Sequence, residues 1–103
     1  TDFRMMIEAG GLDAVMVATP DHTHFTASKA ALDAGLHVFC EKPLAHTVQE
    51  CRILAELAAR KKLVTQMGTQ IHAGDNYRRV VEVIRSGAIG EVKEVHTWCD
   101  KSW

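Results

Sequence analysis

Short apolar runs that alternate with helical patterns constrain the fold of this chain most strongly. Continuous or nearly continuous apolar runs occupy residues 12–18, 37–40 and 63–67, and each run ends at a proline or glycine turn signal. Proline ends a central strand because it has no backbone N–H to donate to a neighbouring strand. Strands that alternate with helices form βαβ units, which have parallel strands and right-handed crossovers. The sequence therefore predicts an α/β fold with a parallel sheet, in which the strand at 12–18 is covered on both faces.

The segments between and beyond these runs carry helix start and stop signals. Helices are predicted over residues of about 2–9, 23–34, 47–61 and 76–86. Thr47 and Glu50 match a capping box, in which each side chain accepts a hydrogen bond from the other residue's backbone N–H. Asp21 or Thr23 can cap the second helix, and Asp75 is predicted to cap the last one. The run from Val92 to Trp98 alternates imperfectly, as a half-buried strand does.

Composition excludes several classes of protein. A hydrophobic fraction of 47% is enough for one small globular unit, and the net charge of −1, with scattered charges, leaves no footprint for nucleic acid or an anionic membrane. No apolar run approaches the roughly 18 residues of a membrane span. Three cysteines are an odd number and favour buried thiols in a reducing, cytoplasmic compartment over a disulfide framework. The histidines and cysteines show no zinc-ligand spacing, so no metal is expected.

Three polar segments follow the carboxyl ends of the predicted strands, at residues 19–24, 41–43 and 67–72. Open parallel sheets bind ligands beyond this edge, so we expect the segments to converge there. A lysine fixed at a strand end, such as Lys42, can polarise a carbonyl or stabilise an alkoxide, although a solvated charge pair with Glu41 is an equal alternative. Spacing alone favours a packing or capping role for His24, a surface loop for 70–72 and a packing role for Tyr77.

These residues together resemble a known family. The strand ending in Thr19-Pro20, His24, the run 35–38 and the motif Glu41-Lys42-Pro43-Leu44 are similar to the second half of the Rossmann domain in Gfo/Idh/MocA oxidoreductases. Residues 85–90 resemble the junction at which that family enters its α+β C-terminal domain. The resemblance implies that residues 1–72 belong to a doubly wound NAD(P)-binding domain and that 73–103 begin the substrate and oligomerisation domain. Residues 67–103 also look like a subgroup that is often exported by a twin-arginine signal, which makes the periplasm the alternative location.

The resemblance implies specific roles at the edge of the sheet. Lys42 is the catalytic or substrate-polarising lysine, and His72 faces the substrate or the nicotinamide. The residues implied to bind or shape the site of the cofactor, NAD or NADP, are Thr19, Pro20, His24, Glu41, Pro43 and Gln70. Family members mostly oxidise or reduce a carbinol of a sugar, inositol or related polyol, and the chain is expected to form homo-oligomers. Some relatives instead use NAD to cleave glycosides, and a non-catalytic sensor on the same scaffold is a further alternative.

Two parts of the family pattern are not found in this sequence. A glycine-rich phosphate loop is expected before residue 1, and the second catalytic group, usually a histidine, is expected beyond residue 103. The chain by itself is therefore expected to be inactive. Without its first strands, the predicted strand at 13–18 would also have an unpaired edge, which favours association. We expect a second chain to cover this edge and the 92–98 strand.

Overall fold

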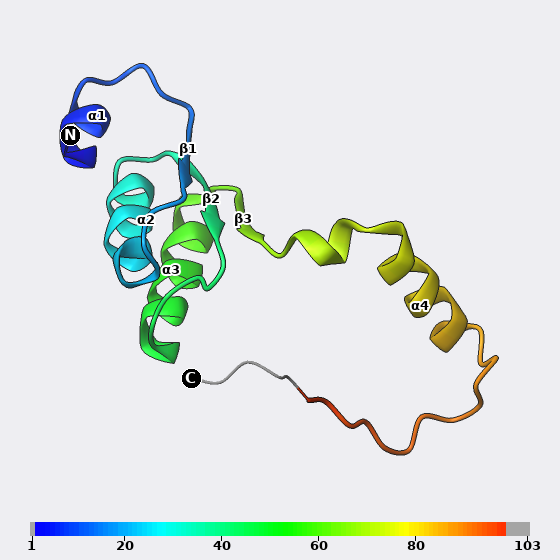
Figure 1. The fold of residues 1–103 in the computed structure, drawn as a ribbon. Coiled ribbons are helices and arrows are strands. Elements are labelled where there is room, and N and C mark those ends of the chain that lie inside the picture. The colour runs from blue at the N-terminus through cyan, green and yellow to red at the C-terminus, as the bar shows by residue number, and fades with distance from the viewer. Residues whose placement is uncertain (1, 99–103) are drawn as a thin grey trace. The chain divides into compact units, whose positions relative to one another are not determined.

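The computed structural model describes residues 2–98, and the chain divides into two units, residues 1–69 and residues 70–103. The first unit contains a parallel sheet with its helices (Figure 1). The elements of the first unit are α1 (Phe3–Glu8), β1 (Ala14–Val17), the 3-10 helix η1 (Asp21–Thr23), α2 (His24–Asp33), β2 (His37–Glu41), α3 (Val48–Lys61) and β3 (Thr65–Gly68). Those of the second unit are the 3-10 helix η2 (Gln70–Ala73) and α4 (Asp75–Arg85).

The three predicted strands form one parallel sheet in the order β1-β2-β3. Val17 pairs with Cys40, and Cys40 in turn pairs with Met67, so the three carboxyl ends lie at one edge. This confirms the predicted parallel arrangement. Strands β1 and β3 begin two residues after the starts of their apolar runs, because strand pairing starts only at Ala14 and Thr65, whereas β2 begins at His37 as predicted.

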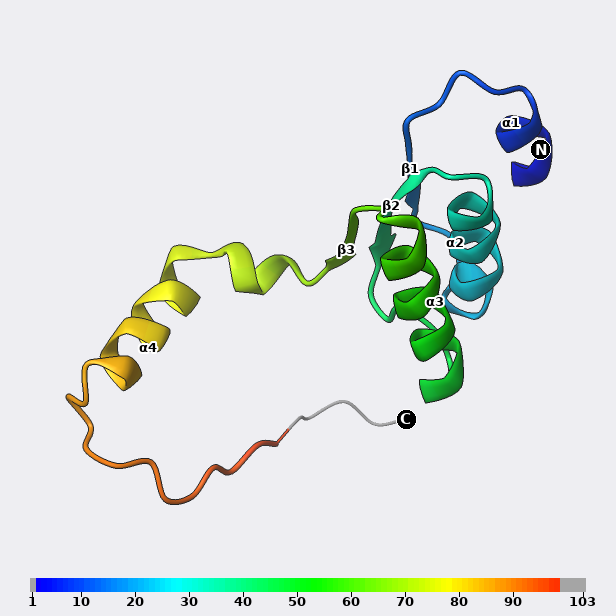
Figure 2. The same ribbon diagram turned by 180° about the vertical axis from the view of Figure 1, so that it is seen from behind.

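Helices α2 and α3 pack side by side on the same face of the sheet, as both ribbon views show (Figures 1 and 2). The strand period of two directs Val38 and Cys40 toward these helices, where they are 5% and 1% exposed. Ala31 is fully buried, and its small side chain allows α2 to approach the sheet closely. The buried apolar core consists of Val17, Ala27, Ala31, Leu32, Leu36, Val38, Cys40, Leu54, Leu57 and Ala58.

The other face of the sheet is open among the described residues. Met16 on this face is 65% exposed, and its neighbour Phe39 is half-buried. The prediction that the first strand is covered on both faces is therefore wrong for residues 2–98, because the described helices that pack on the sheet lie on one side. Along its outer edge, β1 also pairs with no strand of the described part of the chain.

The helix starts were predicted with mixed success. Glu50 N–H donates to Thr47 Oγ1 at 3.2 Å, and Thr47 N–H donates to Glu50 Oε2 at 3.0 Å, which confirms the capping box of α3. Thr23 is the N-cap residue of α2, but its hydroxyl makes no capping bond to that helix. The cap predicted for Asp75 is wrong: Gly74 is the N-cap residue, and Asp75 is already the first helical residue of α4.

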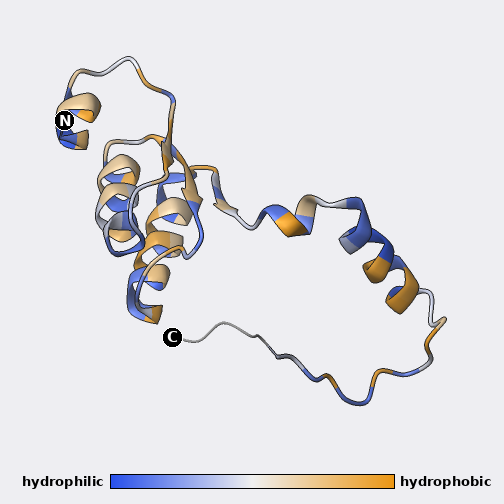
Figure 3. Cartoon of the chain, in the orientation of Figure 1, coloured by the Kyte–Doolittle hydropathy of each residue, from blue (hydrophilic) through white to orange (hydrophobic). Residues whose placement is uncertain are grey.

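The second unit consists of η2, α4 and an extended tail. Helix α4 contains both polar and apolar residues (Figure 3). Its apolar residues Val80, Val83 and Ile84 are each 45–49% exposed. Residues 91–98 form no strand, so the predicted strand from Val92 to Trp98 is wrong. A strand requires a hydrogen-bonded partner strand, and the described residues provide none for this segment. None of the helices within 2–98 is long and apolar enough to span a bilayer.

Candidate functional site

The carboxyl edge of the sheet brings together the predicted residues of the first unit. Thr19 and Pro20 follow β1 directly, Lys42 and Pro43 follow β2, and Gly68 ends β3. The register places Glu41 opposite Gly68 and Val17 opposite Cys40, so these segments begin at the same level. The prediction that Thr19, Lys42 and Gly68 share one edge is confirmed. We call this edge, with Thr19, Pro20 and 41–43, the β-edge site.

Lys42 is an exposed side chain on a fixed piece of backbone. The strand β2 ends at Glu41, immediately before Lys42, and the Pro43 carbonyl that follows contacts His24. The Lys42–Pro43 peptide bond is cis. Within residues 2–98, no carboxylate lies within ion-pair distance of the Lys42 ammonium. The ammonium is therefore available to a ligand, while its main chain is held on both sides.

Glu41 is half-buried, and its carboxylate lies directly over Gly68 of the neighbouring strand. A Cβ atom added to Gly68 would be 2.5 Å from Glu41 Oε2 and 2.9 Å from Glu41 Cδ. Real Cβ atoms essentially never approach other atoms this closely, so only glycine leaves the carboxylate in its place. Gly68 thus determines where a predicted cofactor-binding side chain lies. The sequence marked Gly68 only as a strand stop, because the contact depends on the register between β2 and β3.

His24 is the first residue of α2, and its ring is almost completely enclosed, with 1% exposure. Its Nδ1 lies 2.6 Å from the Pro43 carbonyl oxygen, and its Nε2 lies 2.8 Å from the Thr19 carbonyl oxygen. The ring therefore connects the segment after β1 to the segment after β2. That His24 lines a cofactor cleft stays a prediction; in the described residues both ring nitrogens face backbone carbonyls.

The segment after β1 is a tight turn with its own hydrogen bonds. The Thr23 N–H donates to the Pro20 carbonyl oxygen at 2.9 Å, and the Thr23 hydroxyl donates to the same oxygen at 2.7 Å. The Thr23 hydroxyl also lies 2.7 Å from the Thr19 hydroxyl. Thr19 and Pro20 remain exposed on this turn. Their side chains are thus presented to solvent on a backbone that the turn and the His24 ring hold in place.

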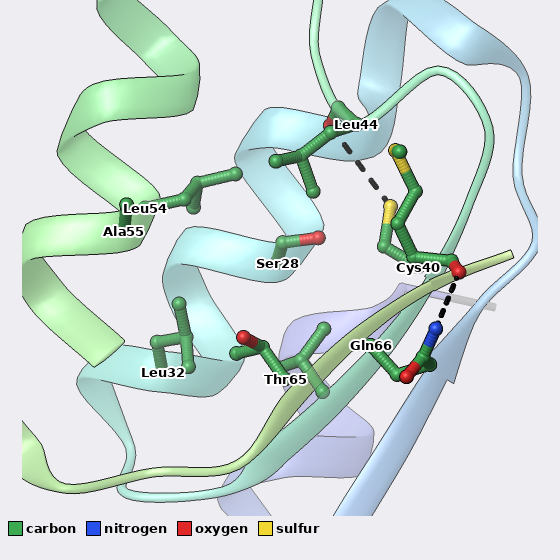
Figure 4. A pocket seen from close by; sticks show the side chains of 10 residues that line it. Ser28, Leu32, Cys40, Leu44, Leu54, Ala55, Thr65 and Gln66 are labelled. Carbon is green, nitrogen blue, oxygen red and sulfur yellow. Dashed lines mark hydrogen bonds between the residues drawn. The ribbon is translucent and has the colours of Figure 1, made fainter. Parts of the chain in front are cut away.

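A mainly apolar cavity of about 150 Å³ lies between the helices and the strands (Figure 4). Ser28 from α2, Leu54 from α3 and Cys40 from β2 are among its lining residues, and the Ser28 hydroxyl has no hydrogen-bond partner among the described residues. Burial raises the pKa of the Cys40 thiol above its ordinary value. Cys40 is 1% exposed and packs as a small residue of the buried core.

The remaining predicted site residues lie in the second unit. Gln70 begins η2, and the ring of His72 stacks on Tyr77 with 4.7 Å between the centroids. Their roles toward the cofactor and the substrate stay predictions, as does a domain boundary after residue 72. Cys40 and Cys51 are free thiols, and Cys99 lies outside the described residues. Residues 2–98 contain no cluster of three or more histidine, cysteine or acidic side chains that could hold a metal.

The parallel sheet, its crossover helices and the polar β-edge site define a Rossmann-type α/β unit. A family model described as an oxidoreductase family with an NAD-binding Rossmann fold matches residues 1–69. The chain therefore belongs to the Gfo/Idh/MocA family.

Curated relatives and solved structures agree with this assignment. Inositol 2-dehydrogenase 1 of Saccharopolyspora erythraea is 39% identical over 92 residues, covering 88% of this chain and 27% of the relative. Inositol 2-dehydrogenase of Azotobacter vinelandii is 41% identical over 97 residues, covering 92% and 28%. The crystal structure of an inositol dehydrogenase homolog from A. vinelandii, complexed with NADH and myo-inositol, superposes with a TM-score of 0.84 at 38% identity, covering 87% and 25%. The chain thus spans about a quarter of the proteins that it matches.

Proposed function

We propose that this chain belongs to an NAD(P)-dependent dehydrogenase or reductase that acts on a sugar, inositol or related polyol, with Lys42 as the group that handles the proton or polarises the carbonyl. The observation that carries this proposal is the position of Lys42: an exposed ammonium at the carboxyl end of a central strand, on backbone fixed from both sides. The family assignment and the inositol dehydrogenases among the relatives support the class of substrate.

The β-edge site fits the polar part of a nicotinamide cofactor. Glu41 offers a half-buried carboxylate, which suits a hydroxyl donor such as a ribose, and Thr19 offers an exposed hydroxyl. Pro20 and Pro43 have fixed φ angles, so the backbone at these positions is rigid. They also have no backbone N–H, so they present no main-chain donor to a ligand. When bound, NAD(P) supplies the hydride acceptor or donor, and the chain's own residues supply placement and proton handling.

The role of Lys42 follows from the atoms that must move. Oxidation of a carbinol breaks the C–H bond as a hydride leaves and breaks the O–H bond as a proton leaves. The neutral amine of Lys42 would accept that proton, and in the reverse direction its ammonium would donate the proton to the carbonyl oxygen. An ammonium near the oxygen also stabilises the negative charge that develops there. Groups of this kind contribute factors of about 10² to 10⁴ in rate.

The test is turnover by the full-length protein with NAD and with NADP on a panel of inositols and sugars. Lys42→Ala should lower kcat by about 10²-fold or more, with little change in affinity for the cofactor. Lys61→Ala is the matched control. Lys61 is the last residue of α3, whereas Lys42 precedes this helix, and the Lys61 ammonium donates to the Asp33 carbonyl oxygen. A Lys42→Ala variant within a few-fold of the wild type would contradict the role of Lys42.

The same assay separates the competing activities. Net formation of NAD(P)H from a free polyol is the result that the proposal predicts. Cleavage of a glycoside without net formation of NAD(P)H would contradict it and indicate an NAD-dependent glycoside hydrolase. Absence of both activities in a protein that binds NAD would indicate a sensor.

A further inference from the structure

The enclosed ring of His24 makes two contacts of the same chemical kind. One ring nitrogen lies 2.6 Å from the Pro43 carbonyl oxygen and the other lies 2.8 Å from the Thr19 carbonyl oxygen. Carbonyl oxygens only accept hydrogen bonds, so a ring nitrogen that carries a proton donates to the carbonyl beside it. The ring thus lies between two acceptors of the main chain, one from each segment.

These contacts join two segments just beyond the last paired residues of β1 and β2. Thr19 follows β1 and Pro43 follows β2, and the ring spans them from the first residue of α2. Lys42 lies between the end of β2 at Glu41 and the Pro43 carbonyl that His24 holds. A shift of the Pro43 peptide group would displace the main chain of Lys42 directly.

Packing alone does not account for a histidine at this position. The ring is 1% exposed and lies beside the apolar core, where an aromatic or aliphatic side chain would fill the space without a polar group to satisfy. No carboxylate lies within ion-pair distance of the ring among residues 2–98. Its polar partners are the two carbonyl oxygens at the β-edge site.

We propose that His24 is a positioning residue for Lys42: its ring lies between the Thr19 and Pro43 carbonyls, ties the Thr19 segment to Pro43, and so fixes where the Lys42 ammonium meets the substrate. This inference rests on the proposed function, because Lys42 is the group through which His24 acts. A displacement of about 1 Å at a reacting group can cost a factor of about 10² in rate.

The test is a double-mutant cycle in the full-length enzyme. His24→Phe keeps a planar ring and removes both ring nitrogens, and it should lower kcat by about tenfold or more. In a Lys42→Ala background the same change should alter kcat by less than about twofold, because coupled residues do not add. His22→Phe is the matched control: His22 is exposed, lies two residues earlier, and should have no effect in either background.

Each outcome decides the matter. If His24→Phe lowers kcat by the same factor in the wild-type and Lys42→Ala backgrounds, His24 only stabilises the fold. Wild-type turnover in His24→Phe would also overturn the proposal. If His24→Phe does not fold, His24→Gln, which keeps a donor for one carbonyl, replaces it; failure of both variants to fold would make the residue purely structural. If Lys42→Ala itself keeps full turnover, the proposed function fails at Lys42. A crystal structure of the wild type should then still show the His24 ring between the Thr19 and Pro43 carbonyls, and a ring turned away from either carbonyl would overturn the bridge.

Discussion

Replacement of Gly68 by alanine should move one carboxylate and leave the fold intact. The new Cβ would lie 2.5 Å from Glu41 Oε2, 2.9 Å from Cδ and 3.1 Å from Oε1. An ordinary van der Waals contact begins at about 3.4 Å, so the carboxylate must retreat by about 1 Å. The contacting atoms are at the far end of a flexible side chain, and it is therefore Glu41 that moves rather than the strand.

The expected change in stability is small. Alanine restricts the unfolded chain more than glycine does, which stabilises the fold by about 0.4–1 kcal/mol where the backbone geometry is allowed. Forcing Glu41 out of its rotamer costs about 0.5–1.5 kcal/mol. The two effects oppose each other, so the free energy of unfolding should change by no more than about 1 kcal/mol. The larger consequence lies in the binding of the cofactor, if Glu41 contacts it as predicted.

The assay is the dissociation constant of NAD for the full-length wild type, Gly68→Ala, Glu41→Ala and the double variant. Gly68→Ala should weaken binding by about tenfold, which corresponds to about 1.4 kcal/mol. Glu41→Ala removes the atoms that clash, so adding Gly68→Ala to it should change the dissociation constant by less than about twofold. An equal effect of Gly68→Ala in both backgrounds would refute the reasoning, because the glycine would then act without Glu41.

Three further predictions test the fold. Thr47→Ala removes half of the capping box of α3 and should lower the free energy of unfolding by about 1 kcal/mol, measured by urea denaturation; an unchanged midpoint would contradict the role of the cap. The Lys29 ammonium lowers the pKa of Asp33 below its ordinary 3.8, so the pair should stabilise the protein above about pH 4 and lose this contribution as the pH falls through the lowered pKa. Because both side chains are more than 40% exposed, the difference between wild type and Asp33→Asn should stay below about 0.5 kcal/mol and shrink with salt. The 103-residue chain alone should associate through the uncovered edge of β1, visible by sedimentation at micromolar concentration; a sharp monomer peak with cooperative melting would count against it.

The parts of the fold that were predicted correctly depend on local signals. Strands followed from apolar runs ended by glycine or proline, and the start of α3 followed from Thr47 and Glu50, whose reciprocal bonds lie within one turn. One wrong prediction was local, since the N-cap of α4 is Gly74 and not Asp75. The other wrong predictions depend on partners distant in sequence. Residues 92–98 alternate as a strand does, but no strand pairs with them among the described residues. Met16 was predicted to be buried because it lies in an apolar run, but no described helix covers it.

The site shows the same division. The convergence of Thr19, Lys42 and Gly68 could be predicted, because parallel strands bring their carboxyl ends to one edge. The close approach of Glu41 to Gly68 could not, since it depends on the register of two strands. The two carbonyl partners of His24 could not be predicted from the sequence either. Spacing identifies a histidine near a helix start but not the main-chain atoms that its ring contacts.

The most direct test of the central claim is a crystal structure of the full-length protein with NAD and a bound polyol. Lys42 Nζ should lie within about 2.7–3.2 Å of the hydroxyl at the carbon that loses the hydride. The His24 ring should still bridge the Thr19 and Pro43 carbonyls, as it does in the described residues. A complex in which Lys42 points to solvent, while other groups surround that hydroxyl, would contradict the account.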